Sequence, residues 1–206
     1  MSQALASLRA HPAFWGSRTR ETLSTGYPRL DSLLPHGGWP LGGLIEILFP
    51  GEGAGELQLL IPALAKLSGE GRWLAWISPP HLPFGPALRA SGVDLSRLLV
   101  VQTKAPREDE WALEQTLGSG ACGAALAWPE SGVERSLRRL QLAAERGGSL
   151  GFLFRPSEAA RQPSPAALRL GLSSRPGGFL VRVLKGGWGE GTVILRPGLA
   201  PERHDG

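Results

Sequence analysis

The stretch EILFPGEGAGELQLL, residues 46–60, is the part of the chain that indicates its fold most directly. A short apolar run, Leu44–Leu48, leads into a glycine-rich turn, and apolar residues at helical spacing follow the turn. Strand, glycine-rich turn and helix in this order form the framework of a phosphate-binding loop. Such a loop continues with Lys and Ser or Thr, but here Gly55 is followed by Glu56 and Leu57. A carboxylate repels a triphosphate and an aliphatic side chain cannot bind Mg²⁺. The stretch therefore predicts the strand, turn and helix of a phosphate-binding loop but lacks the side chains that bind Mg-ATP.

The composition suits one domain of ordinary size. The chain has 206 residues and a net charge of +4, and from Arg135 to Arg196 it has eleven basic and three acidic residues. A basic surface is typical of proteins that bind nucleic acid or an acidic protein, and equally of an ordinary solvated face. The single cysteine, Cys122, excludes an internal disulfide, and the four histidines show no ligand spacing, so we expect no metal and no cofactor.

Targeting signals are lacking. No apolar run reaches the length of a membrane span, and the N-terminus has no apolar core of a signal peptide. We therefore expect a cytoplasmic protein without membrane contact.

Apolar runs bounded by turn residues alternate with helical patterns along the middle of the chain. The runs predict strands at Leu44–Leu48, Trp73–Ile77, Leu98–Gln102, Gly123–Trp128 and Leu150–Phe154. Helices are predicted between them near Pro86–Ser91, Glu108–Leu117 and Val133–Arg146, the last beginning with a capping box of Ser131 and Glu134. This alternation predicts an α/β fold with a mainly parallel sheet flanked by helices.

The pattern changes after Phe154. Three apolar runs follow without helices between them, which predicts a C-terminal antiparallel meander with Arg169, Arg182 and Arg196 on its outer side. We expect one domain over residues 23–197, an N-terminal segment over 1–22 that is flexible or binds a partner, and a flexible tail over 198–206.

Several spaced motifs resemble the RecA recombinase family. That family reads Ser-Thr-Gly, Leu-Asp, Gly-Gly-x-Pro-x-Gly and then a strand with Glu-Ile. In this chain the corresponding residues are Ser24–Gly26, Leu30–Asp31, Gly37–Gly38 with Pro40 and Gly42, and Glu46–Ile47. The resemblance implies a RecA-like core.

The functional positions of that family are changed. Gly51, Gly53 and Gly55 keep a glycine loop, but Pro80 stands where the family has its catalytic Glu, and Trp128 where it has its metal-side Asp. With Glu56 and Leu57, four positions have lost the groups that hydrolyse Mg-ATP. The resemblance thus implies a degenerate ATPase site and a protein that is not an enzyme.

Two families keep a RecA-like shell without that site. The leading segment and the C-terminal meander resemble ImuA, which implies an accessory protein of SOS-induced translesion DNA synthesis with ImuB and RecA as partners and weak DNA contact. The alternative is SulA, the inhibitor of cell division that binds FtsZ. Candidate contacts to a partner or nucleic acid are Arg155, Arg161, Arg182, Lys185, Trp188 and Arg196.

Overall fold

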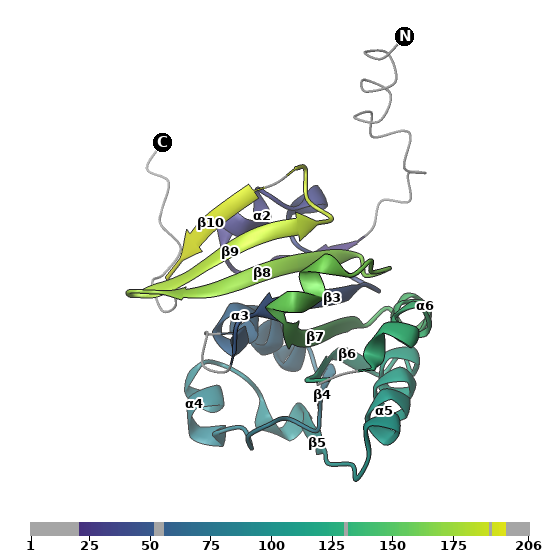
Figure 1. The fold of residues 1–206 in the computed structure, drawn as a ribbon. Helices are drawn as coiled ribbons and strands as arrows, with labels where there is room; N and C mark the ends of the chain where they lie inside the picture. The colour runs from purple at the N-terminus through teal and green to yellow at the C-terminus, as the bar shows by residue number, and fades with distance from the viewer. Residues whose placement is uncertain (1–20, 52–55, 130–131, 190, 197–206) are drawn as a thin grey trace.

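An eight-stranded sheet in the order β10-β9-β8-β3-β7-β6-β4-β5 runs through the protein (Figure 1). The structure is a computed structural model that describes residues 21–51, 56–129, 132–189 and 191–196. The strands are β3 (Leu44–Phe49), β4 (Trp73–Ile77), β5 (Leu98–Val101), β6 (Cys122–Ala127), β7 (Leu150–Pro156), β8 (Leu168–Arg175), β9 (Gly178–Lys185) and β10 (Gly191–Leu195). Strands β1 (Thr22–Leu23) and β2 (Trp39–Pro40) form a separate two-stranded ribbon.

The pairing confirms a mixed α/β fold with a mostly parallel sheet. Strands β8, β3, β7, β6, β4 and β5 are joined by parallel ladders, and β9 and β10 continue the sheet with antiparallel ladders. The predicted meander is present, but its first strand also pairs in parallel with β3, so it extends the central sheet instead of standing apart. The RecA-like identity of the core remains a prediction.

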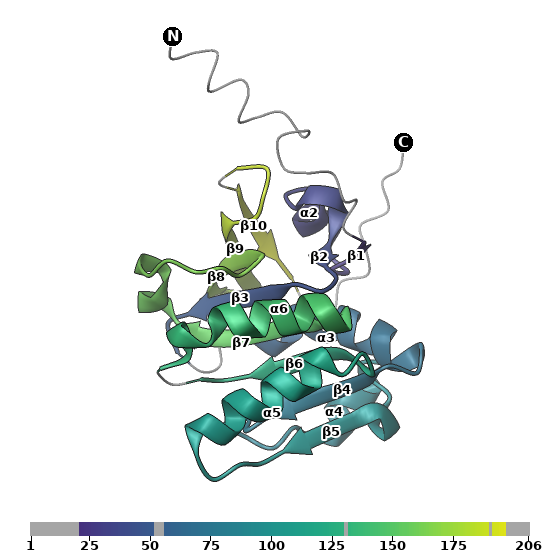
Figure 2. The ribbon, with the colours of Figure 1, turned by 90° about the vertical axis from the view of Figure 1, so that its right-hand side faces the viewer.

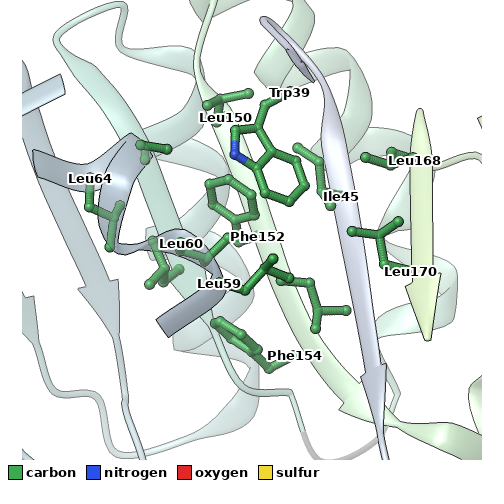
Figure 3. Close-up of a cluster of buried hydrophobic side chains, with 14 of the residues drawn as sticks. Trp39, Ile45, Leu59, Leu60, Leu64, Leu150, Phe152, Phe154, Leu168 and Leu170 are labelled. Atoms are coloured by element: carbon green, nitrogen blue, oxygen red, sulfur yellow. The ribbon is translucent and has the colours of Figure 1, made fainter. Parts of the chain in front are cut away.

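Helices cover both faces of the parallel strands (Figures 1 and 2). The helices are α2 (Pro28–Asp31), α3 (Glu56–Gly69), α4 (Gly85–Ala90), α5 (Pro106–Gly118) and α6 (Leu137–Gly147), with short 3₁₀ turns η2 (Pro35–Gly37), η3 (Leu95–Arg97), η4 (Val133–Arg135) and η5 (Ser157–Arg161). Each face buries its own cluster: α3 packs Leu60 and Leu64 near Phe152 (Figure 3), and α5 and α6 pack Leu117 and Leu140 on the opposite side. Among the described residues, no helix is long and apolar enough to cross a membrane.

Helix α3 contains Pro62 and is nevertheless continuous from Glu56 to Gly69. Proline has no N–H, so the carbonyl four residues earlier, that of Gln58, loses its usual donor. The Tyr27 hydroxyl donates a hydrogen bond to this carbonyl at 2.9 Å. Gly26, with φ of +83°, leaves room for the Pro62 ring, because a Cβ on Gly26 would lie 2.3 Å from the Pro62 Cβ. The leading segment thus supplies the hydrogen bond that Pro62 removes from the helix.

The start of α6 differs from the prediction. The helix begins at Leu137 after Ser136, and Glu134 lies in η4, where its carboxylate pairs with Arg155 and so does not cap the helix. Ser131 lies outside the described residues, as do most of the segment 1–22 and the whole tail 198–206. The Glu134 carboxylate does not accept from a backbone N–H at the start of α6 as in a capping box, because it forms a stronger, charge-assisted hydrogen bond with the buried Arg155 guanidinium.

Candidate functional site

The glycine loop leads directly into α3. Gly51 is exposed, Gly53 and Gly55 lie outside the described residues, and Glu56 and Leu57 are the first two residues of the helix. A carboxylate at a helix N-terminus interacts favourably with the helix dipole, so Glu56 suits its position without any nucleotide. Leu57 packs against the core on the α3 side of the sheet. The Glu56 carboxylate would repel a phosphate, and Leu57 has no atom that could bind phosphate or magnesium.

Aromatic rings gather at the carboxyl ends of the neighbouring strands. Trp128, directly after β6, stacks on Phe154 of β7 with ring centroids 4.8 Å apart. Trp76 of β4 lies 5.8 Å from Trp128, and Phe49 of β3 lies 6.3 Å from Phe154. Trp128 is therefore part of an apolar cluster. An open α/β sheet usually binds its ligand at this edge. Here the edge is packed with aromatic rings, most of which are buried.

The loop between β4 and α4 carries the most exposed apolar side chains of this edge. Pro80 is exposed. Leu82 and Phe84 are 74% and 72% exposed. An apolar depression of about 410 Å³ beside the loop is lined by Gly85, Pro86, Arg89, Ala90 and Leu95. Leu82 and Phe84 were not predicted as contacts from the sequence, although the apolar residues between the prolines of PPHLPF indicate an apolar loop.

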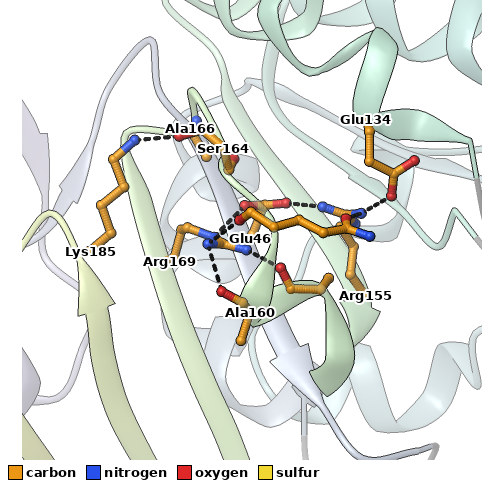
Figure 4. Close-up of polar contacts among 10 residues, drawn as sticks. Glu46, Glu134, Arg155, Ala160, Ser164, Ala166, Arg169 and Lys185 are labelled. Carbon is orange, nitrogen blue, oxygen red and sulfur yellow. Dashed lines mark hydrogen bonds and ion pairs between the residues drawn. The ribbon is translucent and has the colours of Figure 1, made fainter.

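A buried ionic network occupies the face of the sheet next to α6 (Figure 4). Glu46 of β3 is fully buried and pairs with two arginines, Arg155 of β7 and Arg169 of β8; the Arg169 Nε lies 2.7 Å from its Oε2 atom. Arg155 also pairs with Glu134 and donates to the Gln162 side chain at 3.1 Å.

Arg169 holds the segment after β7 onto the sheet. Its guanidinium donates to the carbonyl oxygens of Ala159 at 2.6 Å, Gln162 at 3.0 Å and Ala160 at 3.4 Å. The prediction of Arg169 on the outer side was wrong, because Glu46 directly opposite on β3 draws it inward. Arg155 is 3% exposed, so this candidate contact is enclosed by its ion pairs and does not reach the surface.

A second pocket of about 310 Å³ lies at the ends of β4, β5 and β6. In it the Asp109 carboxylate accepts hydrogen bonds from the Ser78 hydroxyl at 2.5 Å and the Thr103 hydroxyl at 2.6 Å. These bonds tie two strand ends to the first turn of α5. Within the described ranges no group of three or more His, Cys, Asp or Glu side chains could hold a metal ion.

The remaining candidates lie on or near the C-terminal strands. Arg161, Arg182 and Arg196 are exposed, and Trp188 is 69% exposed. Lys185 donates to the Ser164 carbonyl at 2.6 Å, and partial burial lowers the pKa of its ammonium group. The sheet brings Arg182 and Arg196 onto one surface, whereas Arg161 sits in η5.

Comparison with known proteins identifies the relatives. A family model described as "Cell division inhibitor SulA" matches residues 42–151, from the start of β3 to the start of β7. The chain is 35% identical over 133 residues to the SulA of Edwardsiella piscicida, covering 62% of this chain and 78% of the relative. It is 31% identical over 112 residues to the SulA of Photorhabdus laumondii, covering 54% of this chain and 63% of the relative. A crystal structure of SulA from Pseudomonas aeruginosa is 27% identical, with a TM-score of 0.45 over 54% of this chain and 97% of that chain.

These matches overturn the main functional prediction. The expected role in translesion DNA synthesis, with ImuB and RecA as partners, was wrong, because the family model and the curated relatives are described as inhibitors of cell division. The alternative, a SulA-like protein, is the better interpretation, and the description of the family as a cell division inhibitor is consistent with the expectation of a protein that is not an enzyme. The match spans more than half of the chain, and the chain covers more than two thirds of the Edwardsiella relative. The chain belongs to the SulA family of cell division inhibitors.

Proposed function

We propose that this protein inhibits cell division by binding FtsZ and preventing its polymerisation. The family match carries the proposal, because residues 42–151 include β3 to β6 and helices α3 to α6, the framework of the α/β core. The protein acts in the cytoplasm, where FtsZ assembles, through residues 23–197 as one domain.

The loop between β4 and α4 is the contact surface for FtsZ in this proposal. Leu82 and Phe84 lie within the matched residues and are among the most exposed large apolar side chains described. Exposed aromatic and aliphatic residues beside a shallow apolar depression are typical of the centre of a protein–protein interface. The depression at Gly85, Pro86 and Leu95 would receive an apolar side chain from the partner.

The inhibitor works without nucleotide turnover. A degenerate RecA-like site is supported by Glu56 at the head of α3 and by Trp128 stacked on Phe154. Binding without turnover suits an inhibitor that acts by occupying a surface of its target. The protein therefore needs no cofactor.

Polymerisation of FtsZ with GTP, followed by light scattering and sedimentation, tests the proposal. We expect the wild-type protein to reduce polymer at near-stoichiometric concentration. A Leu82→Ser/Phe84→Ser double variant should lose about tenfold or more in inhibition, because removal of central apolar anchors weakens interfaces by about 2 kcal/mol. The matched control is Trp111→Ser on α5, since Trp111 is 64% exposed and also lies within the matched residues.

Two results would overturn parts of the proposal. Unchanged FtsZ polymerisation with excess wild-type protein would refute the function itself. Full inhibition by the double variant, with loss of inhibition in the Trp111 variant, would move the contact surface from the loop to α5.

A further inference from the structure

Within the described residues, no helix covers one face of the sheet at the C-terminal strands. Side chains of β9 alternate: Phe179, Val181 and Val183 are buried in the core, while Arg182 and Leu184 are exposed on the other side. The buried side packs in the same cluster as Leu30 and Leu34 of the α2 region. In Figures 1 and 2, α5 and α6 cover β7 and β6, and no described helix lies over the outer side of β9 and β10.

This open face is built from alternate residues of three strands. We define it by the residues that share the outer side: Gly171, Ser173 and Arg175 of β8, Leu180, Arg182 and Leu184 of β9, and Thr192, Ile194 and Arg196 at β10. The cross-strand partners of Arg182 are Gly171 and Thr192. Both are small, so the longer Arg182 side chain extends beyond them and is exposed to solvent. Ile194 is the partner of Leu180, which makes an aliphatic pair.

The charge of the open face has one sign. Arg175, Arg182 and Arg196 are exposed, and none of them forms an ion pair with a described residue. From Leu168 to Arg196 the sequence has five basic residues and one acidic residue, Glu190, which lies outside the described part of the chain. Arg169 shares this side of β8 but is neutralised by Glu46. Three exposed arginines that have no acidic partner among the described residues therefore lie together on the open face.

Apolar surface lies between these arginines. Ile194 is 53% exposed and Leu184 is 38% exposed. Leu184 lies close to Gly171, where an added Cβ would be 3.6 Å from the Leu184 Cδ1 atom. Because Gly171 has no side chain, nothing from β8 projects above the sheet at this position. Arg182 lies between Leu180 and Leu184 on β9, and Arg175 and Arg196 lie toward one end of the face, so aliphatic and positively charged side chains are interleaved. Such a face matches a partner that offers both apolar and acidic side chains. A nucleic acid would instead place phosphates over the apolar residues.

We propose that the open face binds an acidic amphipathic helix of a partner protein. A sheet face of this kind is normally buried by a helix, and a helix about 10 Å in diameter spans about two strands spaced about 4.8 Å apart. Leucine-like side chains of the helix cover Leu180, Leu184 and Ile194. Its carboxylates form forked hydrogen bonds with Arg175, Arg182 and Arg196.

This surface is separate from the one proposed for FtsZ. The open face lies wholly in residues 171–196, after the residues matched by the family model, whereas Leu82 and Phe84 lie within them. The inference therefore adds a second partner to the proposed function. Inhibition of FtsZ should persist when the open face is altered, so that failure of one proposal leaves the other standing.

Fluorescence anisotropy with a labelled synthetic peptide tests the inference. The probe is a helical peptide of roughly 18 residues with leucines along one face and glutamates along both flanks of that face. The comparison probes are a scrambled peptide of the same composition, a peptide with Lys in place of Glu, and a single-stranded oligonucleotide of about 20 nucleotides. We expect the full chain to bind the acidic amphipathic peptide most tightly.

Variants locate the binding. Arg182→Glu should weaken peptide binding about tenfold or more, and Ile194→Ser about fivefold, because each removes a central contact. Arg107→Glu is the matched control, since Arg107 is exposed on α5 and carries the same charge change; its affinity should stay within about twofold. Circular dichroism and retained inhibition of FtsZ show that the variants are folded.

Three outcomes overturn the inference. One is equal binding of the scrambled or the Lys peptide. Another is an equal loss of affinity in the Arg107 and Arg182 variants. The third is tighter binding of the oligonucleotide than of the acidic peptide, reduced by Arg182→Glu, which would make the face a nucleic-acid surface.

Discussion

Removal of the Tyr27 hydroxyl should destabilise the protein specifically because α3 contains Pro62. In a Tyr27→Phe variant the Gln58 carbonyl loses the hydrogen bond of 2.9 Å that replaces the missing proline donor. A net hydrogen bond contributes about 0.5–1.5 kcal/mol, and this bond lies near the surface, so we expect a loss of about 1 kcal/mol in the free energy of unfolding. That corresponds to a fall in Tm of roughly 2–4 °C for a chain of this length. Urea unfolding followed by circular dichroism measures the change.

A double-mutant cycle with Pro62→Ala separates this bond from other effects of the substitution. Alanine restores an N–H at position 62, which can donate to the Gln58 carbonyl within the helix. Tyr27→Phe should then cost roughly half as much or less in the Pro62→Ala background. An equal loss in both backgrounds would refute the idea that the Tyr27 hydroxyl compensates for the proline.

The same hydroxyl predicts a dependence on alkaline pH. Burial raises the pKa of Tyr27 in the folded protein above its ordinary value of 10.0. The folded state then holds this proton more tightly than the unfolded state, so the stability from this group is fully present below pH 10 and is lost as the pH rises above it. The Tyr27→Phe variant should lose this part of the alkaline decline, while a variant that declines as steeply as the wild type would contradict the assignment.

Three further predictions concern the buried network, the cysteine and the glycine loop. Glu46→Gln leaves two buried arginines without their shared carboxylate and should cost about 3 kcal/mol or more by urea unfolding, whereas the exposed control Glu70→Gln should stay within about 0.5 kcal/mol. Burial raises the pKa of the Cys122 thiol, so the folded protein should react slowly with a disulfide reagent at pH 8 and much faster in denaturant; rapid labelling of the folded protein would contradict this. Glu56→Lys alone should leave ATP hydrolysis at the level of a buffer blank, because Leu57 and Trp128 are unchanged; measured turnover would show that the site is not lost at several points.

The strands and helices of the core could be predicted from the sequence. Apolar runs such as Trp73–Ile77 and Leu150–Phe154 are short, bounded by turn residues and separated by helical patterns, and the structure places β4 and β7 there. The local pattern suffices in these places because both faces of the sheet are covered there. Consecutive residues of such a strand must then be apolar, which gives a continuous apolar run in the sequence. Strand β5 departs from this pattern, since it lies at the sheet edge and is partly exposed.

The burial of charged residues could not be predicted in the same way. Arg155 and Arg169 look like surface arginines in the sequence, because a charged residue in a strand normally faces water. Only the parallel pairing of β3 with β7 and β8 brings both guanidinium groups to Glu46, which lies 109 residues before Arg155. Of the candidate contacts, Arg155 is therefore buried, whereas Arg182 and Arg196 remain exposed.

The sequence by itself determined the mixed α/β architecture and the presence of Glu56 and Leu57 directly after the glycine-rich turn. These properties depend on residue type and spacing along the chain, which are fully visible in the sequence. Only the tertiary structure decided that Trp128 stacks on Phe154, that Tyr27 supports Pro62 and that Arg182 remains uncovered beside Ile194. Each of these depends on which parts of the chain pack against one another, and that is decided by the packing of the whole core and not by any local pattern.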